Sequence, residues 1–177
     1  MNPRVITVGH STHPIEEFLE LLRGTNVTCV VDVRTLAGSR HNPQFNEENL
    51  SPSLESAGIA YLREKRLGGL RKAAHAIDPE VNGFWENQSF HRYADYALSA
   101  TFSEGLDRLI DLATPPRLPA IMCSEAVWWR CHRRIIADYL IARGIPVAHL
   151  MPDGRLDPAT LTKGAHPMAD HTVTYPV

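Results

Sequence analysis

Short runs of β-branched and apolar residues alternate with segments of helical periodicity over most of this 177-residue chain. The apolar runs lie at residues 5–9, 27–33, 59–62, 120–123 and 147–150. Helical spacing of apolar side chains between such runs is typical of the right-handed crossovers that connect parallel strands. The alternation predicts an α/β fold, with a single domain over residues 1–150. Its sheet is mostly parallel and doubly wound, with about five strands and helices on both faces.

Two segments interrupt the alternation. Residues 64–88 contain Gly68-Gly69, Pro79 and Asn82-Gly83 and have few periodic apolar positions, which predicts a long loop. Loops of that length in compact domains are usually functional or disordered. Residues 151–177 hold proline, glycine and scattered histidine without periodicity, so we predict an irregular C-terminal tail.

Composition narrows the classes of protein that need to be considered. A 44% hydrophobic chain of this length fits one domain with its own core, and a formal net charge of −2 argues against a strongly basic nucleic-acid binder. Three cysteines without a secretory signal predict reduced thiols in a cytoplasmic protein. No apolar run approaches the roughly 20 residues that cross a bilayer, so we expect no membrane association. Homo-oligomerisation stays open.

Polar clusters follow four of the predicted strands. They are Gly9-His10-Ser11, Asp32-Val33-Arg34, Arg63-Glu64 and Cys123-Ser124-Glu125. The carboxyl ends of parallel strands meet at one edge of a sheet, and ligands of open α/β sheets bind there. The sequence therefore predicts one polar pocket to which several strands contribute.

Several of these motifs occur together in a known family. They are Val8-Gly9-His10-Ser11, Asp32-Val33-Arg34, Leu67-Gly68-Gly69-Leu70-Arg71, Cys123-Ser124-Glu125 and Cys131-His132-Arg133, in that order. Together they resemble the bacterial and archaeal family called domain of unknown function 488, from about Val5 to Leu150. The resemblance implies an α/β fold and a shared polar site, but no known activity.

Cys123 is a candidate nucleophile, because a thiol at a strand end that faces a helix N-terminus has its pKa lowered by the helix dipole and by nearby arginines. Tyrosine phosphatases place an arginine six residues after such a cysteine, whereas Trp129 stands there in this chain and Arg130 is one residue later. The alternative is a small buried residue that only packs. Asp32 and His10 are candidates for acid–base roles at the same rim. An ion pair between Asp32 and Arg34 is the structural alternative.

The turn Cys131-His132-Arg133 allows three interpretations. Cys123 and Cys131 could form a reversible disulfide, although their spacing is not that of a Cys-x-x-Cys motif. Cys123, Glu125, Cys131 and His132 could bind zinc, but no pair has the usual spacing of structural zinc ligands. We favour the third, an anion site in which Arg133, held by Asp32 or Glu125, and free helix N–H groups face a phosphate or carboxylate.

Further residues are expected to contact the ligand. The predicted ligand-binding set is Ser11, Arg34, Gly68, Gly69, Arg71, Glu125, His132 and Arg133, and we predict no metal and no cofactor. A basic cluster in the long loop has aromatic neighbours that suit phosphate contacts and base stacking; its members are Arg63, Lys65, Arg66, Arg71 and Lys72, beside Phe84, Trp85 and His91.

The predicted function is binding of an anionic, phosphate-bearing ligand, such as a nucleotide or a nucleic-acid end. Thiol- or carboxylate-assisted catalysis by a phosphate-ester or nucleotide-processing enzyme is left open. One alternative is a non-catalytic nucleic-acid or nucleotide binding module. The other is a metal-binding or thiol-redox protein that uses Cys123, Cys131 and His132. The sequence has no serine elbow, Walker loop or dinucleotide fingerprint.

Overall fold

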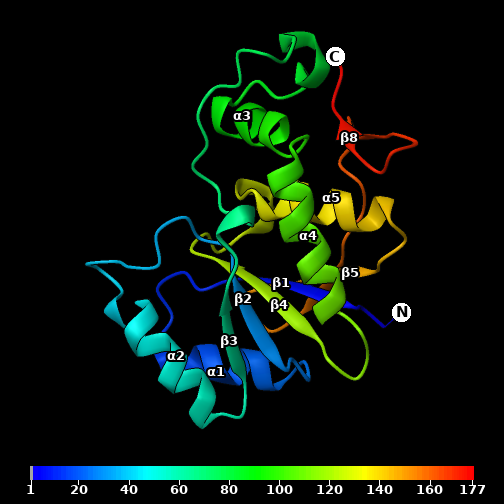
Figure 1. The fold of residues 1–177 in the computed structure, drawn as a ribbon. Coiled ribbons are helices and arrows are strands. Elements are labelled where there is room, and N and C mark those ends of the chain that lie inside the picture. The colour runs from blue at the N-terminus through cyan, green and yellow to red at the C-terminus, as the bar shows by residue number, and fades with distance from the viewer. Residues whose placement is uncertain (1) are drawn as a thin grey trace.

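A six-stranded sheet forms the centre of the molecule in a computed structural model of the protein, which describes residues 2–177 (Figure 1). Its strands are β1 (Val5–Gly9), β2 (Cys29–Asp32), β3 (Ala60–Arg63), β4 (Pro119–Cys123), β5 (Val147–Leu150) and β6 (Leu156–Pro158). Their order is β3-β2-β4-β1-β5-β6, and only β6 is antiparallel to its neighbour. The α/β class and the mostly parallel sheet are thus confirmed.

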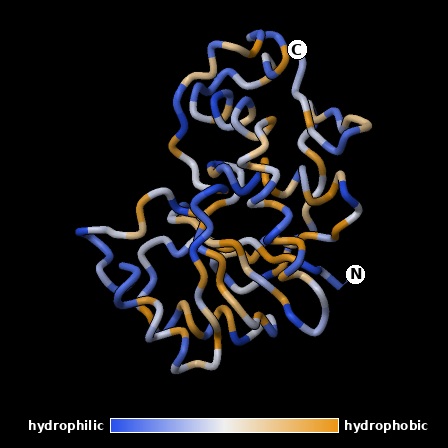
Figure 2. The backbone as a smooth tube through the Cα atoms, viewed as in Figure 1, coloured by the Kyte–Doolittle hydropathy of each residue, from blue (hydrophilic) through white to orange (hydrophobic). Residues whose placement is uncertain are grey.

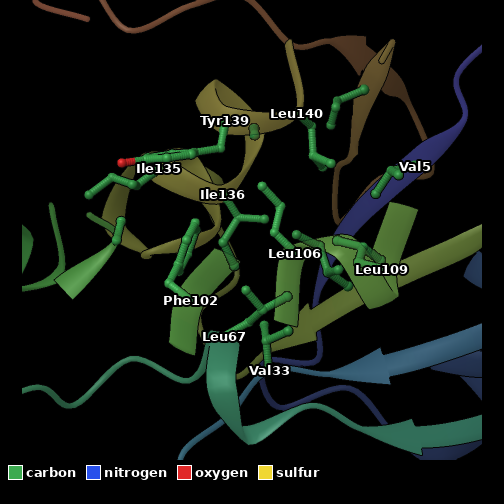
Figure 3. Packing of buried hydrophobic residues seen from close by; sticks show 14 of the residues in the cluster. Val5, Val33, Leu67, Phe102, Leu106, Leu109, Ile135, Ile136, Tyr139 and Leu140 are labelled. Carbon is green, nitrogen blue, oxygen red and sulfur yellow. The ribbon is translucent and has the colours of Figure 1, made fainter. Parts of the chain in front are cut away.

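Helices cover both faces of the sheet (Figure 1). The helices are α1 (Ile15–Arg23), α2 (Glu47–Ser56), α3 (Gln88–Tyr96), α4 (Ala100–Leu112) and α5 (Arg133–Ala142). Alternate residues of each buried strand point to opposite faces, so the apolar runs supply two cores. One core packs the strands against α1 and α2. The other packs them against α4 and α5, as Figure 3 shows for Leu106 and Ile136, and the apolar chain gathers around the strands in Figure 2.

At the carboxyl end of β4, the connections between strands run to opposite faces of the sheet. The connections that follow β1 and β2 run through α1 and α2 on one face, whereas the connection that follows β4 runs through α5 on the other. Since β4 lies between β1 and β2, neighbouring chains leave the sheet in opposite directions at its carboxyl edge. A crevice opens at such a switch point.

The parallel register brings the predicted polar clusters to the same level of that edge. Gly9 pairs with Cys123, and Asp32 pairs with both Met122 and Arg63. The structure therefore decides, through its strand order, that the ends of β1, β2 and β4 are immediate neighbours.

The C-terminal segment departs from the irregular tail that the sequence predicted. Residues 156–158 extend the sheet as β6, and β7 (His166–Pro167) pairs with β8 (Val173–Thr174) in a small hairpin. Asp138 in α5 anchors the segment, since its carboxylate accepts hydrogen bonds from the Thr162 amide and the Tyr175 hydroxyl. Strands of two or three residues are too short to leave a period in the sequence.

The predicted long loop at residues 64–88 has no α-helix or strand up to residue 87, where α3 follows at Gln88, although it contains two short 3₁₀ helices, Lys65–Leu67 and Pro79–Asn82. Within residues 2–177, the helices are too short or too polar to cross a membrane.

Candidate functional site

An open cleft of about 920 Å³ lies at the carboxyl edge of the sheet, and we call it the strand-end cleft. Its walls are the loops that follow β1, β2 and β4, the segment around Gly69 and the start of α3. Eight of the predicted site residues line it: His10, Ser11, Arg34, Gly69, Arg71, Cys123, Glu125 and His132. Asp32, Gly68 and Arg133 do not.

The loop after β1 lies directly on the loop after β4. The amides of His10 and Ser11 donate to the carbonyls of Cys123 and Ser124, at 2.9 and 3.0 Å. A Cβ on Gly9 would stand 1.7 Å from the Glu125 carbonyl oxygen, so only glycine permits this approach. Ser11 has a positive φ of 48°, a backbone conformation that non-glycine residues seldom adopt.

His10 is buried in the floor of the cleft, where its ring stacks on Phe45 with a centroid separation of 4.3 Å. Its Nδ1 lies 2.8 Å from the Ser11 carbonyl oxygen, which can only accept, so the proton sits on Nδ1. Its Nε2 then accepts from Arg34 Nη1 at 3.3 Å. Burial lowers the pKa of His10 to about 4, and the imidazole is therefore neutral at pH 7.

Asp32 is fully buried beneath the cleft and does not line it, contrary to the expectation that it lies at the rim. Its carboxylate receives a two-pronged contact from Arg34, with Nε at 2.9 Å from Oδ1 and Nη2 at 2.7 Å from Oδ2. The Tyr61 hydroxyl also donates to Oδ2, at 2.5 Å. Asp32 thus holds the Arg34 guanidinium at the cleft wall, as the ion-pair alternative proposed.

Two cysteines stand together in the cleft. The Sγ atoms of Cys123 and Cys131 lie 2.7 Å apart, and both thiols are free. Burial, and then the contact with Cys131, raises the pKa of Cys123 well above its usual value. Burial also opposes ionisation of Cys131, but the Cys123 contact and the neighbouring His132 and Arg133 outweigh it and lower the pKa of Cys131 well below its usual value. Against the expectation for Cys123, these directions favour Cys131 as the thiolate of the pair.

The surroundings of Cys131 explain this difference. It lies two residues before the start of α5, and its Sγ accepts a hydrogen bond from the Arg133 amide at 3.5 Å. His132 Nδ1 lies 3.5 Å from the same sulfur, while His132 Nε2 lies 3.0 Å from the Val33 carbonyl oxygen. The carbonyl requires the proton on Nε2, so Nδ1 presents its lone pair to Cys131.

Arg133 does not face the cleft, which corrects its predicted role as the anion clamp. Its side chain is 1% exposed; Nη2 donates to the Glu125 carbonyl at 2.8 Å and Nη1 to Thr7 Oγ1 at 3.4 Å. It forms no ion pair with Asp32 or Glu125, the carboxylates that the sequence suggested as its partners. The guanidinium instead ties the β4–α5 loop to β1 and leaves its positive charge near Cys131.

The Gly68-Gly69 turn serves packing within the protein. A Cβ on Gly68 would lie 2.8 Å from Thr35 Oγ1, and one on Gly69 would lie 3.1 Å from His132 Nδ1. Arg71 lines the cleft, but its guanidinium donates to the Gly68 and Lys65 carbonyls and covers the Tyr96 ring at 3.7 Å. Gly68 itself is buried and does not line the cleft.

The basic cluster of the long loop does not form one patch. Arg66 pairs with Glu64, and Arg63 donates to the Arg34 and Thr35 carbonyls. Trp85 is buried, with the Arg134 guanidinium 5.0 Å from its ring centroid. Of the cluster, Arg71 and Lys72 reach the cleft.

Two further arginines line the cleft and were not among the predicted site residues. Arg92 and Arg130 are exposed there, beside the exposed Lys72. None of the three forms an ion pair with another described residue. Arg130 could have been predicted as a site residue, because it stands one residue past the position of the phosphatase arginine. Nothing in the sequence around Arg92 distinguishes that residue.

Metal ligands do not gather at this site. Within residues 2–177, no group of three or more His, Cys, Asp or Glu side chains is placed to hold an ion.

Comparison with protein families identifies a match over most of the chain. A family model described as "Domain of unknown function DUF488" matches residues 14–140, from the residue before α1 to within α5. Comparison with curated proteins and with solved structures gave no match.

Proposed function

We propose that this chain, which belongs to the DUF488 family of unknown function, binds a phosphate-bearing ligand in the strand-end cleft. A nucleotide or a nucleic-acid end would supply such a ligand. The observation that carries the proposal is the charge around the cleft. Lys72, Arg92 and Arg130 have no carboxylate partner, and Glu125 is the only carboxylate among the described residues that line it.

Backbone donors of residues that line the cleft would add to this positive potential. Among residues 2–177, the amides of Ser124, Glu125 and Ala126 donate to no backbone carbonyl, and all three residues line the cleft. Successive free N–H groups that follow a strand are well suited to oxyanions. They would act alongside the cations without adding net charge.

Arg34 is a preorganised cation at the cleft wall. Asp32 accepts from its Nε and Nη2, and His10 accepts from its Nη1. A guanidinium has five N–H groups, so one remains on each terminal nitrogen. Because Asp32 already restricts the side chain, a ligand oxygen that accepts from Arg34 costs little conformational entropy.

The size of the cleft favours a nucleotide over a free phosphate ion. Ligand pockets for small organic molecules span about 300–1,000 Å³, and this cleft has about 920 Å³. Phe90 lines it and stacks on Trp85, with centroids 4.9 Å apart. An aromatic face beside cations suits a base and its phosphate.

Calorimetric titration tests the proposal with AMP, ADP, inorganic phosphate, adenosine and a short single-stranded DNA bearing a 5′-phosphate. Arg130→Gln should weaken binding of the phosphorylated ligands by about tenfold, since it removes one charge-assisted contact of about 1–2 kcal/mol. Arg117→Gln is the matched control, because Arg117 is exposed and without an ion pair at the other end of β4.

The proposal fails if no phosphorylated ligand binds the wild-type protein, or if the Arg117 and Arg130 variants lose affinity equally. Adenosine should bind more weakly than AMP, because it lacks the group that the cations attract. Phosphate release in the same samples distinguishes an enzyme from a binding module.

A further inference from the structure

The two thiols of the strand-end cleft are arranged for chemistry that anion binding does not use. Cys123 ends β4 and Cys131 lies eight residues later, just before α5, and the intervening loop brings the two side chains together. Their Sγ atoms are 2.7 Å apart, against about 2.05 Å in a disulfide. The two sulfurs are therefore already in contact. The third thiol, Cys29, lies at the opposite end of β2.

The surroundings of the two thiols differ in a way that gives each a separate role. Cys131 Sγ accepts from the Arg133 amide and faces the lone pair of His132 Nδ1. The nearest partner of Cys123 other than Cys131 is the Glu125 carbonyl, 3.7 Å from its sulfur, which can only accept a proton. The first environment favours a thiolate and the second favours a thiol.

His132 is oriented to receive the proton of Cys131. Its Nε2–H donates to the Val33 carbonyl, and its ring packs against Tyr93 with centroids 4.9 Å apart. Gly69 closes the other side, where any Cβ would press on the ring. A nucleophile, a base and a group that orients the base are the components of an activated thiol.

We propose that Cys131 and Cys123 form a thiol–disulfide exchange centre that acts on a low-molecular-weight disulfide admitted by the strand-end cleft. The Cys131 thiolate attacks one sulfur of the disulfide; a new S–S bond forms, the old one breaks, and the leaving thiolate takes the proton held on His132. Cys123 then loses its proton to water and attacks Cys131 Sγ, and the second small thiolate leaves and takes a proton from water. The products are an intramolecular Cys123–Cys131 disulfide and a second small thiol, so the protein loses two electrons and the substrate gains them.

Access restricts this exchange to small partners. Both thiols line the cleft, yet Cys123 is 3% and Cys131 is 6% exposed. A small disulfide can enter a cleft of about 920 Å³, whereas a disulfide within a folded domain is held away from the sulfurs. The centre uses none of the cations that carry the proposed anion binding, so either proposal can fail without the other.

Mass spectrometry of the reduced protein with excess glutathione disulfide tests the proposal. The wild-type protein should lose two hydrogen atoms without retaining a glutathionyl group, and peptide mapping should locate the new bond between Cys123 and Cys131. Cys123→Ser should accumulate one glutathionyl group on Cys131, because no second thiol resolves it. Cys131→Ser should react at least about tenfold more slowly, since the remaining thiols keep their protons. Cys29→Ser, the control, should behave as wild type.

Three results would overturn the proposal. They are a wild-type protein that forms no Cys123–Cys131 bond, a stable adduct on wild-type Cys131, and a Cys131→Ser variant that reacts at the wild-type rate through Cys123. Mapping of the wild-type bond needs no substitution, so it decides the matter even if a serine variant does not fold.

Discussion

Asp32→Asn tests how the buried ion pair supports both the fold and the cleft. The change keeps the size of the side chain but removes the charge that faces the Arg34 guanidinium. It also turns one acceptor oxygen into an NH₂ group. This NH₂ group would face an N–H of Arg34 or the O–H of Tyr61, so two donors would meet without an acceptor. We expect a less stable protein whose Arg34 side chain is less restricted.

The magnitude follows from the burial of the pair. Asp32 is fully buried and Arg34 is 6% exposed, so the variant leaves an uncompensated charge inside the protein. Breaking such a pair costs about 3–5 kcal/mol of unfolding free energy. For a domain of this size, each kcal/mol lowers the melting temperature by about 2–4 °C, which gives a fall of about 6–20 °C.

Urea unfolding at pH 7 measures the loss, together with a double-mutant cycle. Arg34→Met alone should also destabilise the protein, because it leaves the Asp32 carboxylate buried without its cation. The double variant, Asp32→Asn with Arg34→Met, should lose less than the sum of the single losses, by about 2 kcal/mol. The AMP titration of Asp32→Asn should show weaker binding as well.

Additive losses in the cycle would refute this account, because they would mean that the two side chains contribute independently. A loss below about 1 kcal/mol for Asp32→Asn would also refute it, since it would place the pair in the range of exposed salt bridges.

Three further predictions concern the close contact of Gly9 with the β4–α5 loop, the buried histidines and the Cys131 thiol. Gly9→Ala should cost about 3 kcal/mol or more in urea unfolding, because its Cβ would stand 1.7 Å from a carbonyl oxygen of the β4–α5 loop; Gly24→Ala, with no contact below 3.6 Å, should not share that loss. Burial lowers the pKa of His10 and His149 to about 4, so the unfolded chain binds more protons below about pH 6.5. Stability should therefore fall as the pH drops from 6.5 toward 4, by up to about 1.4 kcal/mol per pH unit for each histidine, and substitution of either by glutamine should flatten the fall. Cys131 should alkylate with iodoacetamide at pH 7 faster than the other two cysteines, as followed by peptide mapping; equal rates would contradict the assigned thiolate.

The strands and the class of fold could be predicted because their signals are local. Apolar runs at residues 5–9 and 27–33 contain β1 and β2, the run at 120–123 covers all but the first residue of β4, and helical spacing between the runs indicated crossovers. The short strands β6, β7 and β8 escaped prediction. They pair in short local hairpins, β6 with β5 and β7 with β8, and strands of two or three residues carry no detectable period.

The location of the cleft could also be predicted, but the parts that individual side chains play could not. Polar residues that follow parallel strands must gather at one edge, and His10, Arg34 and Cys123 do so. Sequence spacing says nothing about which of two neighbouring side chains points into a cleft and which points behind it. Arg130 and Arg133 are an example, because both follow β4 within ten residues, yet Arg130 reaches the cleft and Arg133 is buried.

By itself, the sequence determined an α/β sheet and the set of polar residues at its carboxyl edge, since both follow from local periodicity and from the direction of parallel strands. Tertiary structure alone decided the chemistry within that set. The pKa of a thiol depends on charges and hydrogen bonds within a few ångströms, and the partners of Cys131 include Cys123, eight residues earlier. The lone pair that faces Cys131 is oriented by Val33, ninety-nine residues from His132. Such neighbours exist only once β2, β4 and α5 have packed together.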